Sequence, residues 1–371
     1  MIIELKKQEL VRQINIALKA VPNKASMDIL QCIAIHALRD EIKFTTNNLE
    51  LGIEVIIEGK VIEPGSIAIN AKIFSDIIRK LPDDFVMIRT DDNLQTTIQC
   101  GEVEISLTCK SVESFPILPV IVPEHEVRLS QFKLKEMIQQ TAFSISDNQN
   151  RIIMTGELFD IHENNLRLVS MDGYRLSERR IGLKQDCKNI KIIIPGKSLI
   201  ELGKILSDQL EDNVIIQVSQ KHVLFQFESS KIITRLIDGE FFTVNKMITN
   251  EYSTKIRVHK QALLESIDRA SLLVAESEKS PIILQIEGEI LKLKAHSAIG
   301  SLNEKLSIYK EGKNVSIGFH PRYLYEALRA IDEEFIEIYF NSSRTPCIIR
   351  DEECTYIYLI SPVALSEEQL L

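Results

Sequence analysis

Apolar positions at helical spacing recur at a fixed interval along this chain. A predicted helix covers residues 69–81, and similar segments return at 194–206 and 319–331, so the step is 125 residues both times. Two apolar positions correspond in all three segments: Phe74, Leu199 and Leu324 near the middle, and Leu81, Leu206 and Ile331 near the end. Apolar residues at this spacing form one buried stripe on a helix. The sequence therefore predicts three copies of one structural unit.

Each copy also contains a second predicted helix and several predicted strands. The second helix is amphipathic and is marked by Leu10 and Ile14, then Leu134 and Ile138, then Leu263 and Ile267. Apolar and polar residues alternate at 42–45, 166–169 and 291–294, which is typical of a strand with one buried face. Further strands follow an acidic turn at 86–88, 214–216 and 336–338.

These elements predict an α+β fold made of three repeated domains. Each unit would hold two helices and about eight short strands, with the helices on one face of a largely antiparallel sheet. A chain of 371 residues suits two or three domains. Boundaries are expected near 119–126 and 245–252, which gives domains of residues 1–122, 123–248 and 249–371.

The composition narrows the function without deciding it. The net charge is −9, and an acidic chain is a poor first candidate for DNA binding because phosphate contacts require cations. The arrangement of the 44 Lys and Arg residues therefore matters more than the total. The six cysteines form no zinc-ligand pattern and indicate reduced thiols of a cytoplasmic protein. Neither a signal peptide nor a transmembrane helix is expected.

Cations recur at the same two positions of the repeated helix. The first position holds Lys72, Lys197 and Arg322, and the second, seven residues later, holds Arg79, Lys204 and Arg329. Seven residues are about two helical turns, so both cations would lie on one face. Solvated helix faces commonly carry Lys and Arg, and for any single helix that plain interpretation stays open. Recurrence in three copies favours a surface that follows a phosphate backbone without reading base sequence.

Motifs of the common enzyme classes are missing from the sequence. Gly196-Lys197-Ser198 imitates the end of a phosphate-binding loop, but Lys191 occupies the position where the first glycine is required. No dinucleotide-binding glycine pattern, nucleophile elbow or zinc-binding histidine pair is present. Catalytic groups can still converge from distant segments. A nucleic-acid-processing hydrolase built from repeated units and a purely structural repeat protein therefore stay as alternatives.

Three segments of the chain resemble one known family. They are residues 169–176 (VSMDGYRL), 236–241 (LIDGEF) and 356–363 (YIYLISPV). With the threefold repeat, they make the chain similar to the bacterial DNA sliding clamps, the β subunit of DNA polymerase III, from Met1 to about Leu365. The resemblance implies a head-to-tail homodimeric ring, with helices lining the interior and antiparallel sheets outside. It also implies a non-catalytic processivity factor that slides on duplex DNA and needs no cofactor or metal of its own.

Three sets of site residues follow from the repeat and the resemblance. The DNA-facing set is Arg12, Lys19, Lys24, Lys72, Arg79, Lys133, Lys135, Arg151, Lys197, Lys204, Lys260, Arg269, Arg322 and Arg329. The peptide-pocket set, expected between the second and third domains, is Met154, Met171, Gly173, Tyr174, Arg175, Leu176, Phe242, Lys246, Met247, Pro346, Leu359, Pro362 and Val363. The dimer-interface set pairs Ile105 and Leu107 of one subunit with Leu272 and Leu273 of the next.

The resemblance implies several partners. They are duplex DNA, a second copy of the chain, and short linear peptides of the DNA polymerase III catalytic subunit, the clamp loader, repair polymerases and mismatch-repair proteins; no membrane partner is expected. Methionines suit such a pocket because their side chains adapt to varied ligands. Each apolar wall residue taken alone could equally be ordinary core.

The sequence departs from the family in three places. Phe242 and Val244 stand where the family has Pro and Tyr, and Ala364 replaces its usual terminal Arg. A tail, residues 366–371, runs past the usual end. Its last three residues, QLL, resemble part of a clamp-binding peptide, so the tail could either reach the pocket or fray.

Overall fold

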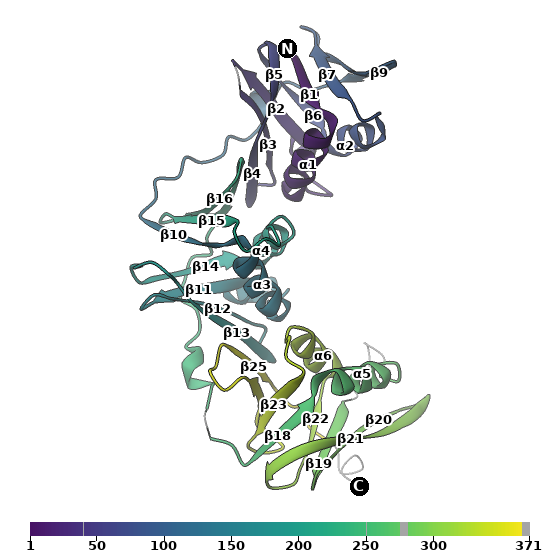
Figure 1. Ribbon diagram of the computed structural model, residues 1–371, viewed down its shortest axis with the longest axis vertical. Helices are drawn as coiled ribbons and strands as arrows, with labels where there is room; N and C mark the ends of the chain where they lie inside the picture. The colour runs from purple at the N-terminus through teal and green to yellow at the C-terminus, as the bar shows by residue number, and fades with distance from the viewer. Residues whose placement is uncertain (40, 250, 275–280, 366–371) are drawn as a thin grey trace. The chain divides into compact units, whose positions relative to one another are not determined.

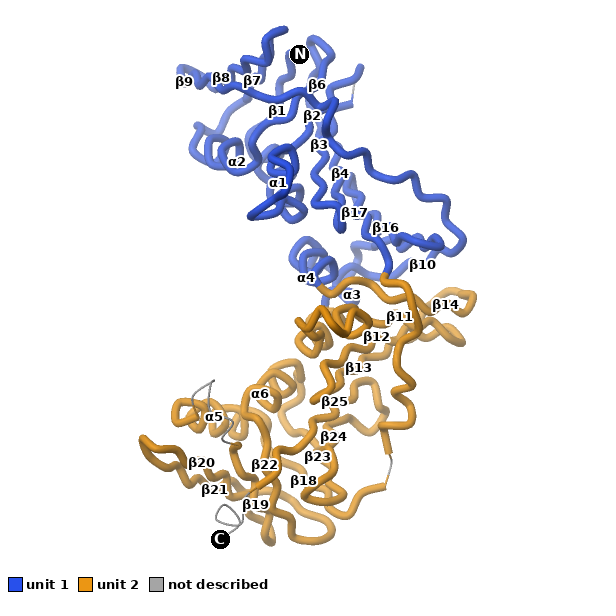
Figure 2. The backbone as a smooth tube through the Cα atoms, turned by 180° about the vertical axis from the view of Figure 1, so that it is seen from behind, with its two compact units in different colours: residues 1–135, 197–236 blue, residues 136–196, 237–371 orange. Residues whose placement is uncertain are grey.

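The chain forms two compact units, and the middle repeat is divided between them (Figure 2). The computed structural model describes residues 1–39, 41–249, 251–274 and 281–365. Unit 1 comprises residues 1–135 and 197–236, and unit 2 comprises residues 136–196 and 237–371. The boundary falls inside helix α3 (Gln131–Thr141) and next to the start of helix α4 (Gly196–Gly203).

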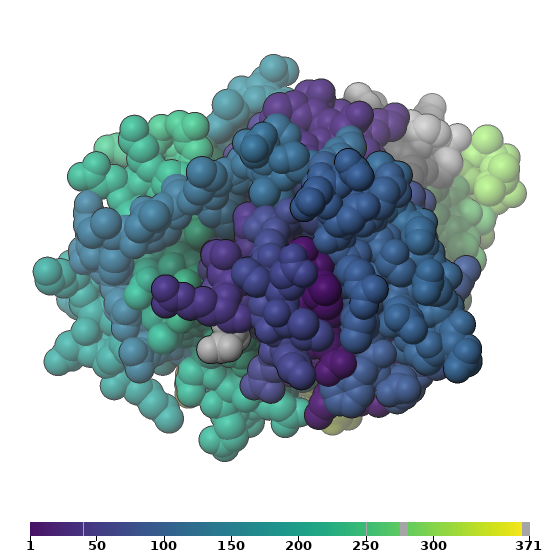
Figure 3. All heavy atoms as spheres, turned by 90° about the horizontal axis from the view of Figure 1, so that it is seen from above, coloured from purple at the N-terminus to yellow at the C-terminus, as the bar shows by residue number. Residues whose placement is uncertain are grey.

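A five-stranded antiparallel sheet forms one part of unit 1. Its strand order is β5 (Gly59–Glu63), β1 (Ile2–Lys6), β7 (Phe85–Thr90), β8 (Gln95–Cys100) and β9 (Val103–Thr108). Every second residue of β7 and β8 is buried, as expected for strands with one face on a core. The purple and blue atoms that face the viewer in Figure 3 belong to the first repeat.

An eight-stranded sheet in unit 1 continues from the first repeat into the second. Its order is β10 (His125–Ser130), β15 (Asn213–Val218), β16 (His222–Phe227), β17 (Ser230–Arg235), β4 (Leu51–Ile57), β3 (Glu41–Asn47), β2 (Cys32–Leu38) and β6 (Gly65–Asn70). The repeats meet where β17 pairs with β4 over five residue pairs, from Ser230 opposite Val55 to Thr234 opposite Leu51.

A glycine in β4 makes room for the segment that leads to the second repeat. The side chain of Leu118 lies against Gly52, and a Cβ added at Gly52 would come within 2.2 Å of Leu118 Cδ2. The neighbouring carbonyl of Pro116 accepts a bond from the Asn47 amide at 3.5 Å. Any larger side chain at Gly52 would therefore force the Leu118 side chain to move.

Two helices of unit 1 lie side by side (Figure 1). α1 (Lys7–Ala17) buries Leu10 and Ile14, and α2 (Ala71–Lys80) begins at an Asn70 cap whose side chain accepts from the Ile73 N–H. The Lys7 ammonium donates to the carbonyl of Leu81, just past the end of α2, at 2.6 Å. A cation at this carbonyl end is favourable because the last carbonyls of a helix carry partial negative charge.

A twelve-stranded antiparallel sheet in unit 2 continues from the second repeat into the third. Its order is β14 (Ile190–Pro195), β11 (Gly156–His162), β12 (Asn165–Met171), β13 (Arg175–Gly182), β25 (Tyr356–Ile360), β24 (Cys347–Arg350), β23 (Phe335–Phe340), β18 (Thr254–His259), β21 (Gly300–Gly312), β20 (Ile290–Ser297), β19 (Ile282–Glu287) and β22 (Val315–Phe319). The junction between repeats is the β13–β25 pairing, again five residue pairs long.

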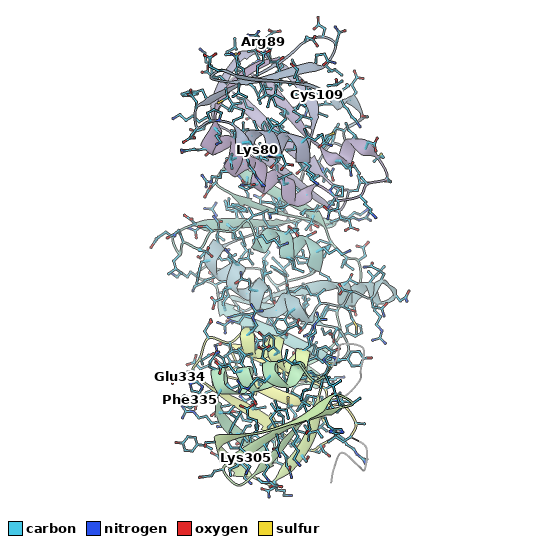
Figure 4. The ribbon with its side chains drawn as sticks, turned by 90° about the vertical axis from the view of Figure 1, so that its right-hand side faces the viewer. Lys80, Arg89, Cys109, Lys305, Glu334 and Phe335 are labelled. Atoms are coloured by element: carbon cyan, nitrogen blue, oxygen red, sulfur yellow. The ribbon has the colours of Figure 1, made fainter. Side chains whose placement is uncertain are left out.

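The third repeat places two helices over its part of this sheet. α5 (Lys260–Ser271) and α6 (Pro321–Arg329) lie side by side. Their residues Leu263 and Leu324 are fully buried in the core of this repeat. The Lys260 ammonium donates to the Ile331 carbonyl at 2.7 Å, which repeats the bond of Lys7 to Leu81. Figure 4 shows Glu334 and Phe335 together at the start of β23. The ring of His259, which caps α5, lies 5.4 Å from the Phe335 ring.

The predicted α+β fold is confirmed. Within the described residues, the first repeat holds strands β1–β9, the second β10–β17 and the third β18–β25, and each repeat has two α-helices. Short 3-10 turns complete the structure: η1 (Leu18–Ala20), η2 (Asp28–Gln31), η3 (Val112–Ser114), η4 (Ala142–Ser144), η5 (Gln149–Thr155) and η6 (Val244–Lys246). Among the described helices, none has the length and apolar character needed to cross a membrane. The exact domain boundaries stay a prediction.

All three predicted helices are shorter than the sequence pattern indicated, because α2 covers Ala71–Lys80 and α6 covers Pro321–Arg329, and the second helix is the shortest. The pattern placed a helix over 194–206, but α4 ends at Gly203 and the chain then turns. Glycine is a poor helix former because it loses the most backbone freedom on ordering. Lys204 therefore lies one residue beyond α4, whereas Arg79 and Arg329 lie in the last turns of α2 and α6.

Candidate functional sites

The six repeated cations are all exposed. Lys72 and Lys197 lie at the beginnings of α2 and α4, and Arg322 lies at the beginning of α6. Their partners seven residues on are exposed as well, including Lys204 in its turn. Exposure follows from the apolar stripe of each helix, because Phe74, Leu199 and Leu324 take the buried side.

Carboxylates accompany several members of the DNA-facing set. Arg12 pairs with Glu228 of the β16–β17 turn, and Arg269 pairs with Glu304 of β21. The hydrogen bond from Arg269 lowers the pKa of Glu304 below its ordinary value. Further pairs of this kind are Lys135–Asp208, Lys204–Glu201 and Arg322–Glu326. In both units, several cations of this set are therefore partly neutralised by the chain itself.

Two members of the DNA-facing set also hold backbone carbonyls. Lys135 donates to Asp208 at 2.6 Å and to the Leu206 carbonyl at 3.2 Å, and Lys260 donates to the Ile331 carbonyl. Both side chains are half-buried. No sequence pattern pointed directly to these bonds, although each lysine lies near the N-terminal end of a predicted helix. Their contact with DNA stays a prediction.

The other members of this set vary in exposure. Lys24 and Lys133 are exposed, Lys19 is half-buried at η1, and Arg151 lies in η5 with its Nη1 4.0 Å from the sulfur of Met154. Arg79 donates to the side-chain oxygen of Asn15 on α1 at 2.6 Å.

An apolar cluster in unit 2 brings together part of the peptide-pocket set. Met154 of η5, Met171 of β12, Leu176 of β13 and Leu359 of β25 pack in one group. Four residues outside the predicted peptide-pocket set complete the group: Leu158, Val169, Val244 and the half-buried Phe241. Leu158 and Val169 stand opposite each other on β11 and β12, so strand alternation alone could have found them. We call these eight residues the apolar patch.

Exposed side chains lie near the apolar patch in the sequence. Tyr174 is 63% exposed and its ring stacks on Tyr323 with centroids 6.2 Å apart. Phe242 and Met247 are also exposed, and the Phe242 ring packs edge-on against Phe241. Lys246 is exposed at the end of η6. Large apolar side chains left in solvent beside a buried apolar group are typical of a binding surface.

The turn between β12 and β13 has a fixed conformation. Gly173 adopts φ +95°, which an L side chain rarely adopts. Asp172 Oδ1 accepts from the N–H of Tyr174 at 2.8 Å and from the N–H of Arg175 at 3.1 Å. The conformation of this turn therefore explains why Asp and Gly occupy its positions 172 and 173.

Arg175 differs from the other predicted pocket residues because its guanidinium is internally bonded. The side chain is only 5% exposed. It donates to Asp172, Glu326 and the carbonyl of Phe143, and it lies 4.6 Å above the Tyr323 ring. A buried guanidinium needs such partners because unpaired buried charge is costly. The structure thus shows Arg175 holding other residues, while direct ligand contact stays a prediction.

Comparison with known proteins identifies the family. Family models for the DNA polymerase III beta subunit match residues 1–119 (N-terminal domain), 128–242 (central domain) and 245–363 (C-terminal domain). The beta sliding clamp of Staphylococcus epidermidis is 32% identical over 359 residues, which cover 94% of this chain and 95% of that protein. This chain belongs to the bacterial beta sliding clamp family.

Solved sliding clamps share the fold along their whole length. A DNA polymerase III beta subunit from Eubacterium rectale is 45% identical, with a TM-score of 0.95 and coverage of 98% of this chain and 99% of that chain. The sliding clamp from Bacillus subtilis is 31% identical, with a TM-score of 0.94 and coverage of 99% and 100%. Members of this family act in DNA replication as non-catalytic processivity factors of DNA polymerase III.

The remaining pocket residues of this clamp family member flank the last strands. Pro346 directly precedes β24, and Pro362 and Val363 follow β25; all three are half-buried. Val363 forms an isolated antiparallel bridge with Gly318 of β22. The tail, residues 366–371, and with it the QLL segment, lies outside the described residues.

The predicted clamp interface residues are not ordinary core. Ile105 and Leu107 are half-buried on β9, which is the outermost strand of its sheet. Leu272, just after α5, is 80% exposed, and Leu273 beside it is half-buried. In the part of the chain that the structure describes, no group of three or more His, Cys, Asp or Glu side chains is arranged to hold a metal ion.

Proposed function

We propose that two copies of this chain close head to tail into a ring around duplex DNA. The ring slides without sequence preference and tethers the replicative polymerase and other partners through peptides bound at the apolar patch. The observation that carries the proposal is the threefold recurrence of exposed cations on equivalent helices in a chain that is acidic overall. Such contacts reach phosphates and carry no sequence information.

The partial neutralisation of these cations supports sliding rather than tight gripping. Arg12, Arg269 and Arg322 each pair with a carboxylate, so each phosphate contact must compete with an internal ion pair. A ring need not bind tightly, because retention comes from enclosure. Weak, backbone-only contacts then allow movement along the duplex.

Free sheet edges support closure between subunits. Among the residues that the structure describes, β9 has no neighbour on its outer side, and residues 300–307 of β21 pair with β20 on one side only. Unpaired edges attract further strands unless they are covered. Ile105 and Leu107 beside one edge, and the exposed Leu272 in unit 2, provide apolar contact area for a heterologous interface.

The apolar patch supports peptide binding. Met154 and Met171 offer adaptable surfaces, and the exposed Tyr174, Phe242 and Met247 lie close to patch residues in the sequence. The partners would be peptides of the polymerase catalytic subunit, the clamp loader, repair polymerases and mismatch-repair proteins. The chain itself would catalyse no reaction, and it would work in the bacterial cytoplasm, where the chromosome is replicated.

Retention on circular DNA tests the ring. The clamp is loaded on nicked circular plasmid by the matching clamp loader with ATP, the loader is removed by gel filtration, and half of the DNA is linearised. A sliding ring stays on circles and runs off linear ends. Equal retention on both forms would mean ordinary groove binding and would reject the proposal. A linear plasmid with its ends blocked by bound protein is the matched control, and it should retain the clamp.

A further inference from the structure

One carboxylate in unit 2 connects the DNA-facing set to the peptide-pocket set. Glu326 lies on α6 and uses its two oxygens for two different arginines. Oε2 accepts from Nη1 of Arg175, and Oε1 accepts from Nε of Arg322 at 3.0 Å. Arg322 is exposed on the first turn of α6, whereas Arg175 is buried beside the β12–β13 turn.

Arg175 extends this connection to the turn itself. Its Nε donates to Asp172 Oδ2 at 3.0 Å, and the other oxygen of Asp172 holds the N–H groups of Tyr174 and Arg175. Its Nη2 donates to the carbonyl of Phe143. The guanidinium is therefore fixed on three sides, and the loss of any one partner would loosen the turn that presents Tyr174.

An aromatic contact runs beside the charged one. Tyr323 follows Arg322 on α6, and its ring lies 4.6 Å from the Arg175 guanidinium and 6.2 Å from the Tyr174 ring. Cation–π and stacked contacts of this kind are sensitive to small displacements. The first turn of α6 thus contacts the Tyr174 turn in two independent ways.

We propose that Glu326 couples DNA binding at Arg322 to peptide binding at the Tyr174 turn. The inference rests on the proposed function, because it takes Arg322 as a phosphate ligand. In the free protein, one carboxylate is shared between two cations. When a phosphate takes Arg322, the full charge of Glu326 acts on Arg175. Arg175 is then held more firmly against α6 while it keeps its bonds to Asp172 and to the Phe143 carbonyl, so the Tyr174 turn is better ordered before a peptide arrives.

The coupling has a definite sign. A turn that is already ordered costs less to bind, so DNA tightens peptide binding and, by linkage, a bound peptide tightens the contact with DNA. The polymerase peptide would thus bind better to a clamp on DNA than to a clamp in solution. Couplings of this kind commonly change affinity by about 5-fold to 150-fold. One shared carboxylate places the expected value near the lower end, at about 3-fold to 10-fold.

Peptide affinity on and off DNA measures the coupling. The probe is a fluorescein-labelled synthetic peptide with the clamp-binding segment of the polymerase catalytic subunit. Anisotropy gives its Kd for free clamp and for clamp loaded on nicked circular plasmid, with the loader removed. Wild type should bind more tightly on DNA, and Glu326→Gln should show the same Kd in both states. Arg322→Gln removes only the DNA side of the bridge and should abolish the difference as well.

A matched control separates the bridge from general electrostatics. Glu304→Gln removes one carboxylate beside another DNA-facing arginine, Arg269. Glu304 lies on β21 and not on α6, so this variant should keep the wild-type ratio of Kd values. An equal Kd on and off DNA in wild type, or an undiminished ratio in Glu326→Gln, would overturn the inference. Loss of the clamp from circles would overturn the proposed function and the inference together. Retention on circles with an unchanged Kd would overturn the inference alone.

Discussion

Glu157 is a carboxyl group without exposure, and its replacement by Gln tests the electrostatics of the unit 2 core. It lies on β11 opposite Ile194 of β14 and is 0% exposed. Burial raises the pKa of Glu157 from 4.5 to about 8, and among the described residues neither of its carboxylate oxygens has a hydrogen-bond partner that would hold the charged form. The folded protein therefore keeps a proton at neutral pH that the unfolded chain releases.

The sign and size of the effect follow from these two pKa values. The pKa of Glu157 is higher in the folded state than in the unfolded chain. The protonated Glu157 therefore makes its full contribution to stability below pH 4.5, and this contribution is lost as the pH rises through 8. From pH 4.5 to pH 7 the loss is about 3 kcal/mol, at about 1.4 kcal/mol per pH unit. Gln has nearly the same shape as the protonated acid and does not titrate. The free energy of unfolding of Glu157→Gln should therefore rise steadily relative to that of wild type across this pH range.

Urea unfolding followed by circular dichroism at about pH 5.5, 6.5 and 7.5 measures the difference in the free energy of unfolding. Glu287→Gln is the control, because Lys292 holds the pKa of Glu287 below its ordinary value and the group stays ionised throughout. A constant offset between Glu157→Gln and wild type at all three pH values would refute the reasoning. It would mean that Glu157 is already ionised in the folded state.

Three further predictions concern the core, the interface and the cationic surface. Leu324→Ala should lower the free energy of unfolding by about 3 kcal/mol, because Leu324 is fully buried on the side of α6 that faces the core. A loss below about 1 kcal/mol, measured by urea unfolding, would contradict the core assignment. The double change of Leu272 and Leu273 to Ala should shift the protein to monomer in sedimentation velocity, and an intact dimer would reject this interface. Glu228→Gln should free Arg12 for phosphate and steepen the salt dependence of DNA retention by about one unit of slope, and an unchanged slope would show that Arg12 does not face DNA.

The repeat and the helices could be predicted from the sequence because their signals are local. Helical spacing around Phe74, Leu199 and Leu324 reports burial directly, and all three are fully buried. The end of α4 was missed because the apolar pattern continues to Leu206, whereas the backbone stops at Gly203. A periodic pattern reports which side faces the core and says little about where hydrogen bonding ends.

The continuation of the sheets across repeats could not be predicted. β17 with β4, and β13 with β25, are joined by backbone groups, which leave no side-chain signature. The apolar patch was half found, because Met154 and Leu359 came from a family resemblance while Leu158 and Val244 belong to it only through packing.

The role of Arg175 was also hidden from sequence. The resemblance implies that Arg175 forms part of a pocket wall, yet one of its two carboxylate partners, Glu326, is 151 residues away in the sequence. Partners so far apart in the chain meet only when the fold brings α6 beside the β12–β13 turn. Similarly, the carboxylates that pair with Arg12 and Arg269 lie far from these arginines in the sequence. Glu228 belongs to the β16–β17 turn, and Glu304 belongs to β21.

The two sheet junctions have a mechanical consequence. Each joins neighbouring repeats by five residue pairs of backbone ladder, so a load that separates the repeats must break several hydrogen bonds at once. The interface proposed between subunits would resist the same load with edge strands and a few leucine side chains. A ring of two such chains would therefore keep the first and second repeats joined at β17–β4, and the second and third joined at β13–β25, when a subunit contact opens under strain.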